Sequence, residues 1–224
     1  MASESFVILC SGGLNSTVAA ARAARNGAVN LLHVDYGQPS AARERAAVEA
    51  IGKALGAERV LGVDMPHVRL IASARRRADA ADPSGDAPTL IPPMPSLLDA
   101  AYQWAARITA RAVVVGASQV ADEAEHQVGA GQGTPHRRRE FFHVCEMAFD
   151  ELRSGRPAIR LEVPLIGLSR GDIIKLGKRF SAPLDLCWCC EGAGPQACGQ
   201  CPGCQALACA PESAGHFEPA VAGR

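Results

Sequence analysis

The sequence predicts an α/β protein built on a parallel sheet with helices on both faces. Short apolar runs alternate with longer stretches of helical periodicity, which is the pattern of a doubly wound sheet. A turn with two glycines joins the first apolar run directly to the first helical stretch. With 224 residues, the chain is long enough for one such domain with a small appendage.

Five apolar runs have the length and composition of buried strands: Phe6–Cys10, Val29–Tyr36, Val60–Asp64, Ala112–Gly116 and Arg160–Pro164. Four segments between them have helical periodicity: Leu14–Arg25, Ala41–Leu55, Leu97–Thr109 and Arg139–Leu152. Another helix is expected after Ser169, because Ser169 and Asp172 have the spacing of a capping box. The proline-rich segment Ser73–Ser96 predicts a mobile loop or lid.

Composition narrows the classes of function. The chain has 23 basic and 23 acidic residues, so its charge gives no reason to expect nucleic acid or an anionic membrane as a partner. No leader pattern and no apolar run near about 18 residues is present, so neither secretion nor membrane spanning is expected. We expect a cytoplasmic protein whose nine cysteines are kept reduced.

The turn after the first predicted strand has the composition of an anion site. Gly12 and Gly13 let backbone N–H groups point inward, and the following helix adds partial positive charge at its N-terminus. Hydroxyl donors flank the glycines at Ser11, Ser16 and Thr17. The spacing fits neither the dinucleotide fingerprint nor the Walker loop. The alternative is a tight turn whose glycines are only steric.

Seven of the nine cysteines lie between Cys187 and Cys209, which predicts a metal site. Cys198, Cys201 and Cys204 are separated by two residues each, in a Gly/Pro-rich turn that lets sulfurs converge on one ion. With Cys190 as the fourth ligand, or Cys187 or Cys189 in its place, they are expected to make a closed, structural zinc site. An iron–sulfur cluster and redox-active thiols remain as alternatives, the latter because Cys187, Cys189 and Cys209 are left over.

Five segments in chain order resemble one family. Ser11–Ser16 is similar to the Ser-Gly-Gly-x-Asp-Ser pyrophosphate loop of ATP pyrophosphatases. The other segments resemble motifs of the 7-cyano-7-deazaguanine synthases: Val34–Gln38, Pro135–Phe141, Val163–Ile173 and Trp188–Cys204. The resemblance spans Phe6 to Cys209 and implies a fold like that of the adenine-nucleotide alpha-hydrolases. It implies a pyrophosphatase domain over residues 1–180 and a zinc-binding segment over residues 181–224 that packs on it.

The resemblance implies a C–N bond-forming ligase of queuosine biosynthesis. Such an enzyme uses ATP and Mg²⁺ to adenylate 7-carboxy-7-deazaguanine, lets ammonia displace AMP, and dehydrates the amide to a nitrile. It also implies a homodimer. The nucleotide-binding residues implied are Ser11, Gly12, Gly13, Leu14, Asn15, Ser16 and Thr17 for the pyrophosphate and Asp35, Tyr36 and Gln38 for the adenosine. The catalytic residues implied are Ser16 and Arg138, and Asp122, Glu123 and Glu125 are either magnesium ligands or an exposed helix end.

The chain departs from the family on the substrate side of the expected pocket. Asn15 replaces the aspartate of the loop, and Pro92–Pro95 replaces a Pro-Gly-Arg-Asn segment. His136 replaces another aspartate, and residues Ala121–Thr134 are longer than the corresponding loop. Two alternatives follow. One is a relative that stops at the amide or transfers the adenylated carboxylate to another amine, with a protein as an acceptor. The other is an inactive nucleotide-binding scaffold.

Overall fold

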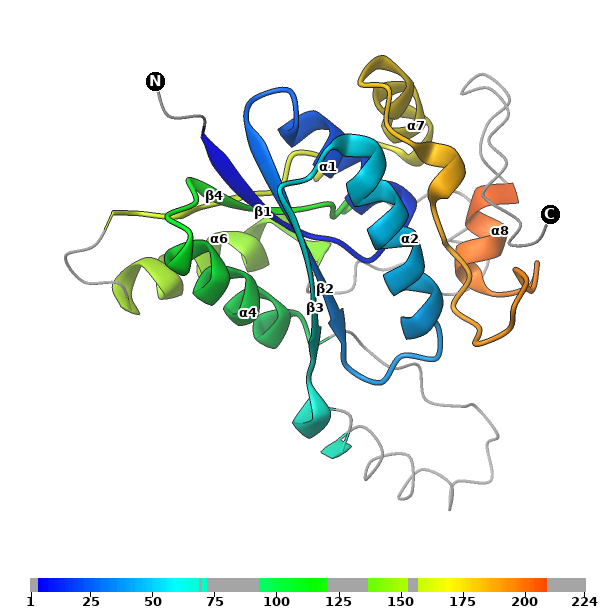
Figure 1. Cartoon of the computed structure of the whole chain (residues 1–224), viewed down its shortest axis with the longest axis horizontal. Helices are drawn as coiled ribbons and strands as arrows, with labels where there is room; N and C mark the ends of the chain where they lie inside the picture. The colour runs from blue at the N-terminus through cyan, green and yellow to red at the C-terminus, as the bar shows by residue number, and fades with distance from the viewer. Residues whose placement is uncertain (1–3, 69, 72–92, 121–136, 153–156, 209–224) are drawn as a thin grey trace.

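The computed structural model describes residues 4–68, 70–71, 93–120, 137–152 and 157–208, and it confirms the predicted α/β architecture (Figure 1). The strands are β1 (Ser5–Leu9), β2 (Ala28–Asp35), β3 (Arg59–Asp64), β4 (Ala112–Val115) and β5 (Arg160–Glu162). The helices are α1 (Leu14–Ala23), α2 (Ala41–Leu55), α4 (Met94–Arg107), α6 (Arg139–Leu152), α7 (Arg170–Arg179) and α8 (Pro202–Ala208). All strand pairs are parallel.

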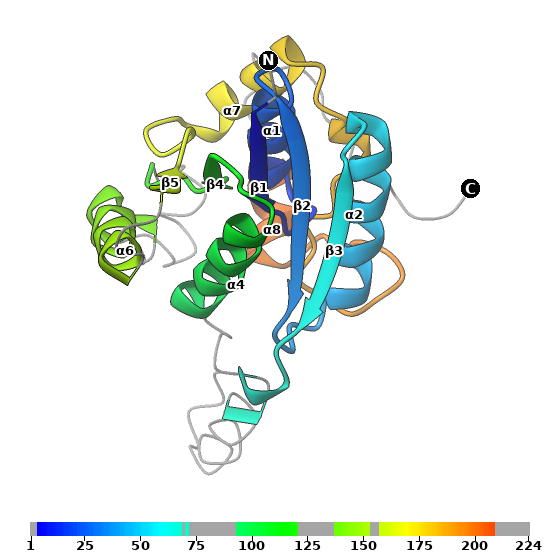
Figure 2. The ribbon, with the colours of Figure 1, turned by 60° about the vertical axis from the view of Figure 1, so that its left-hand side comes forward.

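Two apolar layers cover the sheet, one on each face. Helices α1, α2 and α7 pack against one face, where Ile8 and Leu31 are fully buried, and α4 and α6 pack against the other, where Val7 and Leu32 are fully buried (Figure 2). Burial on both faces explains why the central strands read as continuous apolar runs and not as alternating ones. None of the described helices has both the length and the apolar character needed to cross a bilayer.

The strand order β3-β2-β1-β4-β5 creates a switch point between β1 and β4. The chain winds outward from β1 through β2 to β3, and then returns to the other side of β1 for β4 and β5. In open parallel sheets, ligands bind at the carboxyl ends of the two strands beside such a point. The loop after β1 and the residues after β4 therefore lie where a ligand site is expected.

Most element boundaries differ from the predictions, by one to three residues. Helices α2 and α6 have the predicted bounds, whereas α4 begins three residues early because Pro95 fits the first helical turn. Strand β5 ends at Glu162 and not at the predicted Pro164, since proline has no N–H to donate to the ladder. Of the predicted loop Ser73–Ser96, residues 73–92 lie outside the described residues.

Helix α7 begins as the capping pattern predicts, and this cap gives a test of stability. The Ser169 hydroxyl accepts a hydrogen bond from the Asp172 N–H at 3.2 Å. We expect Ser169→Ala to cost about 1 kcal/mol of stability, which lowers Tm by roughly 2–4 °C in a domain of this size. The control is Lys175→Ala on the exposed side of the same helix. Equal melting temperatures for the two variants in a thermal unfolding experiment would contradict the capping role.

Candidate functional site

A cavity of about 280 Å³ opens at the carboxyl ends of β1 and β4. One wall is the predicted anion loop, represented by Ser11, Gly13, Leu14, Asn15 and Ser16. Gly116 and Ser118, which follow β4, form the neighbouring part of the wall. The cavity thus lies at the switch point of the sheet, where the topology places a ligand.

The anion loop is held by its glycines and hydroxyls. Gly12 has a φ of +76°, and a Cβ there would lie 2.9 Å from the Glu44 carbonyl oxygen, so only glycine fits. The Ser16 and Thr17 hydroxyls both donate to the Gly13 carbonyl, at 3.1 and 2.8 Å. Because α1 begins at Leu14, the first amides of that helix lie at the cavity wall with the positive end of the helix dipole.

Members of the predicted pyrophosphate set have different positions in this loop. Ser11 and Ser16 line the cavity with their hydroxyl oxygens 3.3 Å apart. Thr17 is fully buried behind the wall, where its hydroxyl also accepts from the Cys187 thiol at 3.3 Å. Gly12 is likewise outside the lining residues. Ser11 and Ser16 therefore face the cavity, while Gly12 and Thr17 shape the loop.

Gly116 was not predicted as a site residue, although it controls how closely α1 approaches the end of β4. A Cβ at Gly116 would lie 2.5 Å from the Asn15 carbonyl oxygen and 2.6 Å from the Ser16 nitrogen. The first turn of α1 thus packs directly on the backbone that follows β4. The signal that could have found it is a lone glycine at the end of a buried strand, which marks a close backbone approach.

The predicted adenosine residues shape the turn after β2. The Gln38 side-chain amide donates to the Val34 carbonyl and to Glu44, and its oxygen accepts from the Tyr36 N–H. Asp35 accepts from the Gly37 N–H at 2.9 Å. The residue of this region that lines the cavity is Glu44. Contact between adenosine and Asp35, Tyr36 or Gln38 stays a prediction.

Tyr36 lies close to the acidic side of the cavity. Burial raises the pKa of its hydroxyl, and the Glu44 and Glu191 carboxylates raise that pKa further. Glu191, like Glu44, lines the cavity. The Tyr36 hydroxyl therefore stays protonated at neutral pH and is available as a hydrogen-bond donor beside two carboxylates.

Two arginines also line the cavity. They are Arg137, just before α6, and Arg170, the first residue of α7. Arg138, the predicted catalytic arginine, is exposed and lies outside the cavity lining. Its catalytic role stays a prediction, while the structure adds Arg137 and Arg170 as candidates. Arg170 could have been found from its position directly after the cap residue of the helix that follows β5.

The C-terminal segment also contributes to the cavity. Trp188 and Cys189 line it, and the Trp188 N–H donates to the Gly12 carbonyl at 2.8 Å. The Arg43 guanidinium lies 5.7 Å from the centre of the Trp188 ring, within range of a cation–π contact. A segment far from the loop in sequence thus forms part of the same site.

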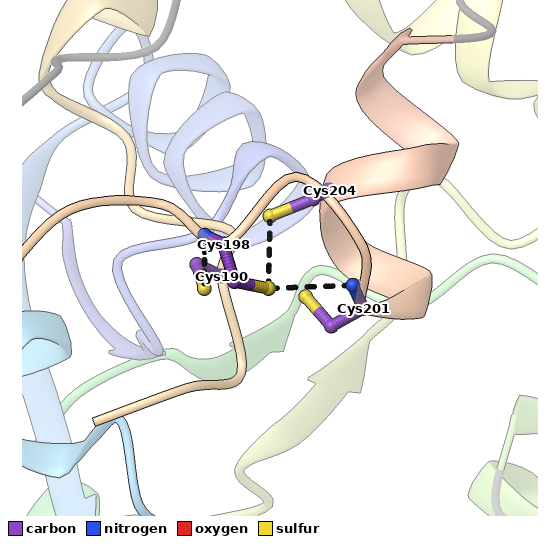
Figure 3. Close-up of side chains that lie close together, drawn as sticks. All are labelled: Cys190, Cys198, Cys201 and Cys204. Carbon is purple, nitrogen blue, oxygen red and sulfur yellow. Dashed lines mark hydrogen bonds between the residues drawn. The ribbon is translucent and has the colours of Figure 1, made fainter. Parts of the chain in front are cut away.

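The four predicted metal ligands converge beside this cavity (Figure 3). The sulfurs of Cys190, Cys198, Cys201 and Cys204 all lie within 4.8 Å of one another. Backbone N–H groups donate to three of these sulfurs, including Cys198 N–H to Cys190 at 3.3 Å and Cys201 N–H to Cys198 at 3.3 Å. Sulfurs this close, supported by backbone donors, match the first and second shells of a tetrahedral metal site.

Comparison with known proteins decides the family. A family model described as "Queuosine biosynthesis protein QueC" matches residues 5–214. The chain belongs to the QueC family. It is 37% identical to the 7-cyano-7-deazaguanine synthase of Koribacter versatilis, over 95% of this chain and 91% of that protein. The synthase of Methanothrix thermoacetophila is 35% identical over 89% and 90%, and that of Acidobacterium capsulatum 30% identical over 90% and 89%.

The remaining cysteines of this QueC-family chain do not join the cluster, as far as the described residues show. Cys187 is buried against Thr17, and Cys189 lines the cavity. Cys209 lies outside the described residues, as do the magnesium candidates Asp122, Glu123 and Glu125 and the substituted His136. The cluster can hold a metal with the four predicted thiols alone.

The pKa values of Cys198, Cys201 and Cys204 indicate how this QueC-family cluster would bind a cation. Hydrogen bonds from the Gln200 and Cys201 amides lower the pKa of Cys198 to about 6, so this thiol is ionised at neutral pH. Burial is the main cause that raises the pKa of Cys204 to about 12, and it also raises the pKa of Cys201. A cation that is bound by all four sulfurs must therefore displace the protons of Cys201 and Cys204.

Because a bound cation must displace protons from thiols, we predict that metal binding depends on pH. Thiols with a raised pKa hold their protons at neutral pH, so binding releases protons and becomes tighter as pH rises. We expect the apparent affinity for Zn²⁺ to increase at least tenfold from pH 6.5 to pH 8, a shift of roughly 1.4 kcal/mol or more. Competition titrations against a chelator of known affinity measure it. An affinity that is independent of pH would show that the four thiols are not the ligands.

Proposed function

We propose that this QueC-family chain uses ATP to convert 7-carboxy-7-deazaguanine and ammonia into 7-cyano-7-deazaguanine. The observation that carries the proposal is the cavity in which the Ser11–Ser16 loop and the arginines Arg137 and Arg170 line one site. Backbone amides at a helix N-terminus and guanidinium groups are the donors that a phosphate chain requires. The relatives named 7-cyano-7-deazaguanine synthase supply the substrate class.

The proposed reaction uses two adenylations. A carboxylate oxygen attacks the α-phosphorus of ATP, and pyrophosphate leaves into the Ser11–Ser16 loop. Ammonia then attacks the acyl carbon, AMP leaves, and the nitrogen loses a proton to give the amide. The amide oxygen next attacks the α-phosphorus of a second ATP, and a second pyrophosphate leaves. Loss of AMP from this adenylated amide, with both N–H protons, gives the nitrile. Each step needs positioning and charge neutralisation more than a side-chain nucleophile.

Roles for the residues follow from their positions. Ser11, Gly13 and Ser16, with the first amides of α1, are proposed to hold the leaving pyrophosphate. Arg170 and Arg137 neutralise charge that develops on the phosphates. Mg²⁺ is proposed to enter with ATP and to supply further neutralisation. The described carboxylates that would hold it are Glu44 and Glu191, since both line the cavity.

The cysteine cluster is proposed to hold one structural Zn²⁺. Four thiols fill a tetrahedron and leave no open position, so the metal is proposed to stabilise the turn that holds Cys190, Cys198, Cys201 and Cys204. Metal analysis of the purified protein is expected to find one zinc per chain. Iron, or less than one zinc per chain, would contradict this assignment. Reduced thiols are also the basis for proposing a cytoplasmic location.

A homodimer is proposed through α6. On this helix Val144, Met147 and Leu152 are 64%, 60% and 81% exposed, although they are large and apolar. An exposed apolar helix face of this kind is typical of an interface. Sedimentation of the purified protein tests the proposal, and a monomer at micromolar concentration would contradict it.

The enzymatic proposal is tested with the purified protein, ATP, Mg²⁺, ammonia and 7-carboxy-7-deazaguanine, with products followed by mass spectrometry. We expect the nitrile. Asn15 gives a reason to look for the second candidate function, because it lines the cavity where the family has aspartate. Accumulation of the amide, or release only with another amine or a protein acceptor, would favour that shortened reaction. Absence of pyrophosphate under all conditions would leave a nucleotide-binding scaffold.

A matched pair of variants separates the neighbouring arginines. We propose that Arg138→Ala and Arg137→Ala affect turnover differently, because both residues are exposed but Arg137 lines the cavity and Arg138 does not. A larger loss of pyrophosphate formation in Arg137→Ala would transfer the predicted catalytic role from Arg138 to its neighbour. A larger loss in Arg138→Ala would support the original prediction.

A further inference from the structure

We propose that the metal cluster and the nucleotide loop are coupled through the segment Cys187–Glu191, called the connecting segment here. Metal in the cluster increases the affinity of the loop for ATP, and bound ATP slows release of the metal. Cys187, Trp188 and Cys189 act as positioning residues that carry this effect. The proposal rests on the proposed function, because it takes ATP as the ligand of the loop.

The first half of the connecting segment holds the nucleotide loop at three points. The Cys187 thiol donates to the Thr17 hydroxyl at 3.3 Å, and that hydroxyl donates in turn to the Gly13 carbonyl at 2.8 Å. The Trp188 N–H donates to the Gly12 carbonyl at 2.8 Å. The Leu14 amide, the first of helix α1, donates to the Cys189 sulfur. The connecting segment therefore contacts Gly12 and the start of α1 directly, and Gly13 through the Thr17 hydroxyl.

The second half of the same segment belongs to the metal cluster. Cys190 is a ligand and accepts the Cys198 N–H at 3.3 Å, and the Glu191 N–H donates to the Cys201 sulfur at 3.4 Å. Gly203 lies so close to this segment that a Cβ there would be 2.0 Å from the Cys189 carbonyl oxygen. One continuous stretch of five residues thus contacts the loop at one end and the cluster at the other.

The cluster is what orders the outer end of this segment. Residues 191–201 form neither helix nor strand, and backbone N–H groups of this stretch donate hydrogen bonds to the sulfurs of Cys190, Cys198 and Cys201. A cation that binds four thiolates closes this turn, and its loss frees it. When the turn is freed, the connecting segment loses its fixed end and the loop loses a rigid support. When one ligand, the metal or ATP, has already ordered the connecting segment, the other loses less conformational entropy on binding. Each ligand therefore increases the affinity for the other by the same factor.

The wild-type, metal-loaded protein gives the direct test. Metal release to a chromogenic chelator is followed with and without saturating ATP that has been premixed with Mg²⁺. We expect ATP to slow release about tenfold, within the usual range of coupling between two sites. In the reverse experiment, calorimetry on chelator-treated protein should show about tenfold weaker ATP binding than on the loaded protein. Circular dichroism checks that the treated protein keeps its helices.

A pair of cysteine variants tests whether the connecting segment carries the effect of ATP on metal release. Cys187→Ala removes the contact with Thr17 without removing a metal ligand, so the metal content should stay the same while the effect of ATP on release falls to about threefold or less. The matched control is Cys145→Ala on α6, which packs against the other face of the sheet and should keep the tenfold effect.

The outcomes distinguish this proposal from the proposed function. A loaded protein that binds neither ATP nor pyrophosphate would overturn both. ATP binding that leaves the rate of metal release unchanged would overturn the coupling alone. An equal loss of the ATP effect in Cys187→Ala and Cys145→Ala would assign it to general destabilisation and not to the connecting segment.

Discussion

Gly116→Ala is expected to reduce pyrophosphate formation at least hundredfold and to lower Tm. The added Cβ would lie 2.5 Å from the Asn15 carbonyl oxygen and 2.6 Å from the Ser16 nitrogen, and both are backbone atoms of the first turn of α1. Neither can rotate away as a flexible side chain does, so α1 must shift from the end of β4. Losing one correctly placed donor in an anion site costs about 10²–10³ in rate, and this shift displaces several donors.

Gly116→Ala is expected to destabilise the fold for the same reason, because the added Cβ overlaps backbone atoms of α1. Overpacking of this kind costs about 1–3 kcal/mol, and each kcal/mol lowers Tm by roughly 2–4 °C in a domain of this size. The control is Gly167→Ala, because nothing lies within 4 Å of a Cβ at Gly167 and its φ is not in the left-handed region. Pyrophosphate release and thermal unfolding measure both effects. Wild-type activity in Gly116→Ala would show that the approach of α1 to β4 is not needed for the reaction.

Arg170→Ala is expected to lower kcat/KM for ATP by about 10²–10³ while it changes Tm little. Arg170, at the start of α7, lines the same cavity as the Ser11–Ser16 loop. In the proposed reaction, removal of its guanidinium takes away one of the two arginines that neutralise the charge developing on the phosphates. Arg170→Lys should recover part of the activity, because it restores the charge but not the paired N–H donors.

Arg179→Ala is the matched control for this position. Arg179 is exposed at the other end of the same helix and is outside the cavity lining. Turnover in this variant should be close to that of the wild type. If Arg170→Ala lowers activity no more than Arg179→Ala does, the assignment of Arg170 to the phosphates is wrong.

The fold could be predicted from local sequence because its signals are local. The apolar run before Gly12 and the helical pattern of Ala41–Leu55 each report burial of neighbouring residues along one element. The spacing from Cys198 to Cys204 fits a metal whatever the rest of the chain does. Ser169 likewise caps a helix through a contact three residues away.

The site could be predicted only in part. Ser11 and Ser16 were found because their motif is continuous, and both line the cavity. Gly116 and Arg170 were missed as site residues because their importance depends on which elements lie across the sheet from them. The three consecutive arginines Arg137–Arg139 also show that motif reading alone is not enough. The sequence favoured Arg138, but Arg137 lines the cavity, because the start of α6 decides which of them faces it.

By itself, the sequence determined the α/β class, the anion loop, the four converging cysteines and the resemblance to the family that the comparisons established. Only the tertiary structure decided which side chains share the cavity, and that the segment from Cys187 to Glu191 joins the loop to the cluster. The physical reason is distance along the chain. Periodicity and motif spacing report interactions within a few residues, whereas the contact between Cys187 and Thr17 spans 170 residues and exists only after the sheet has formed.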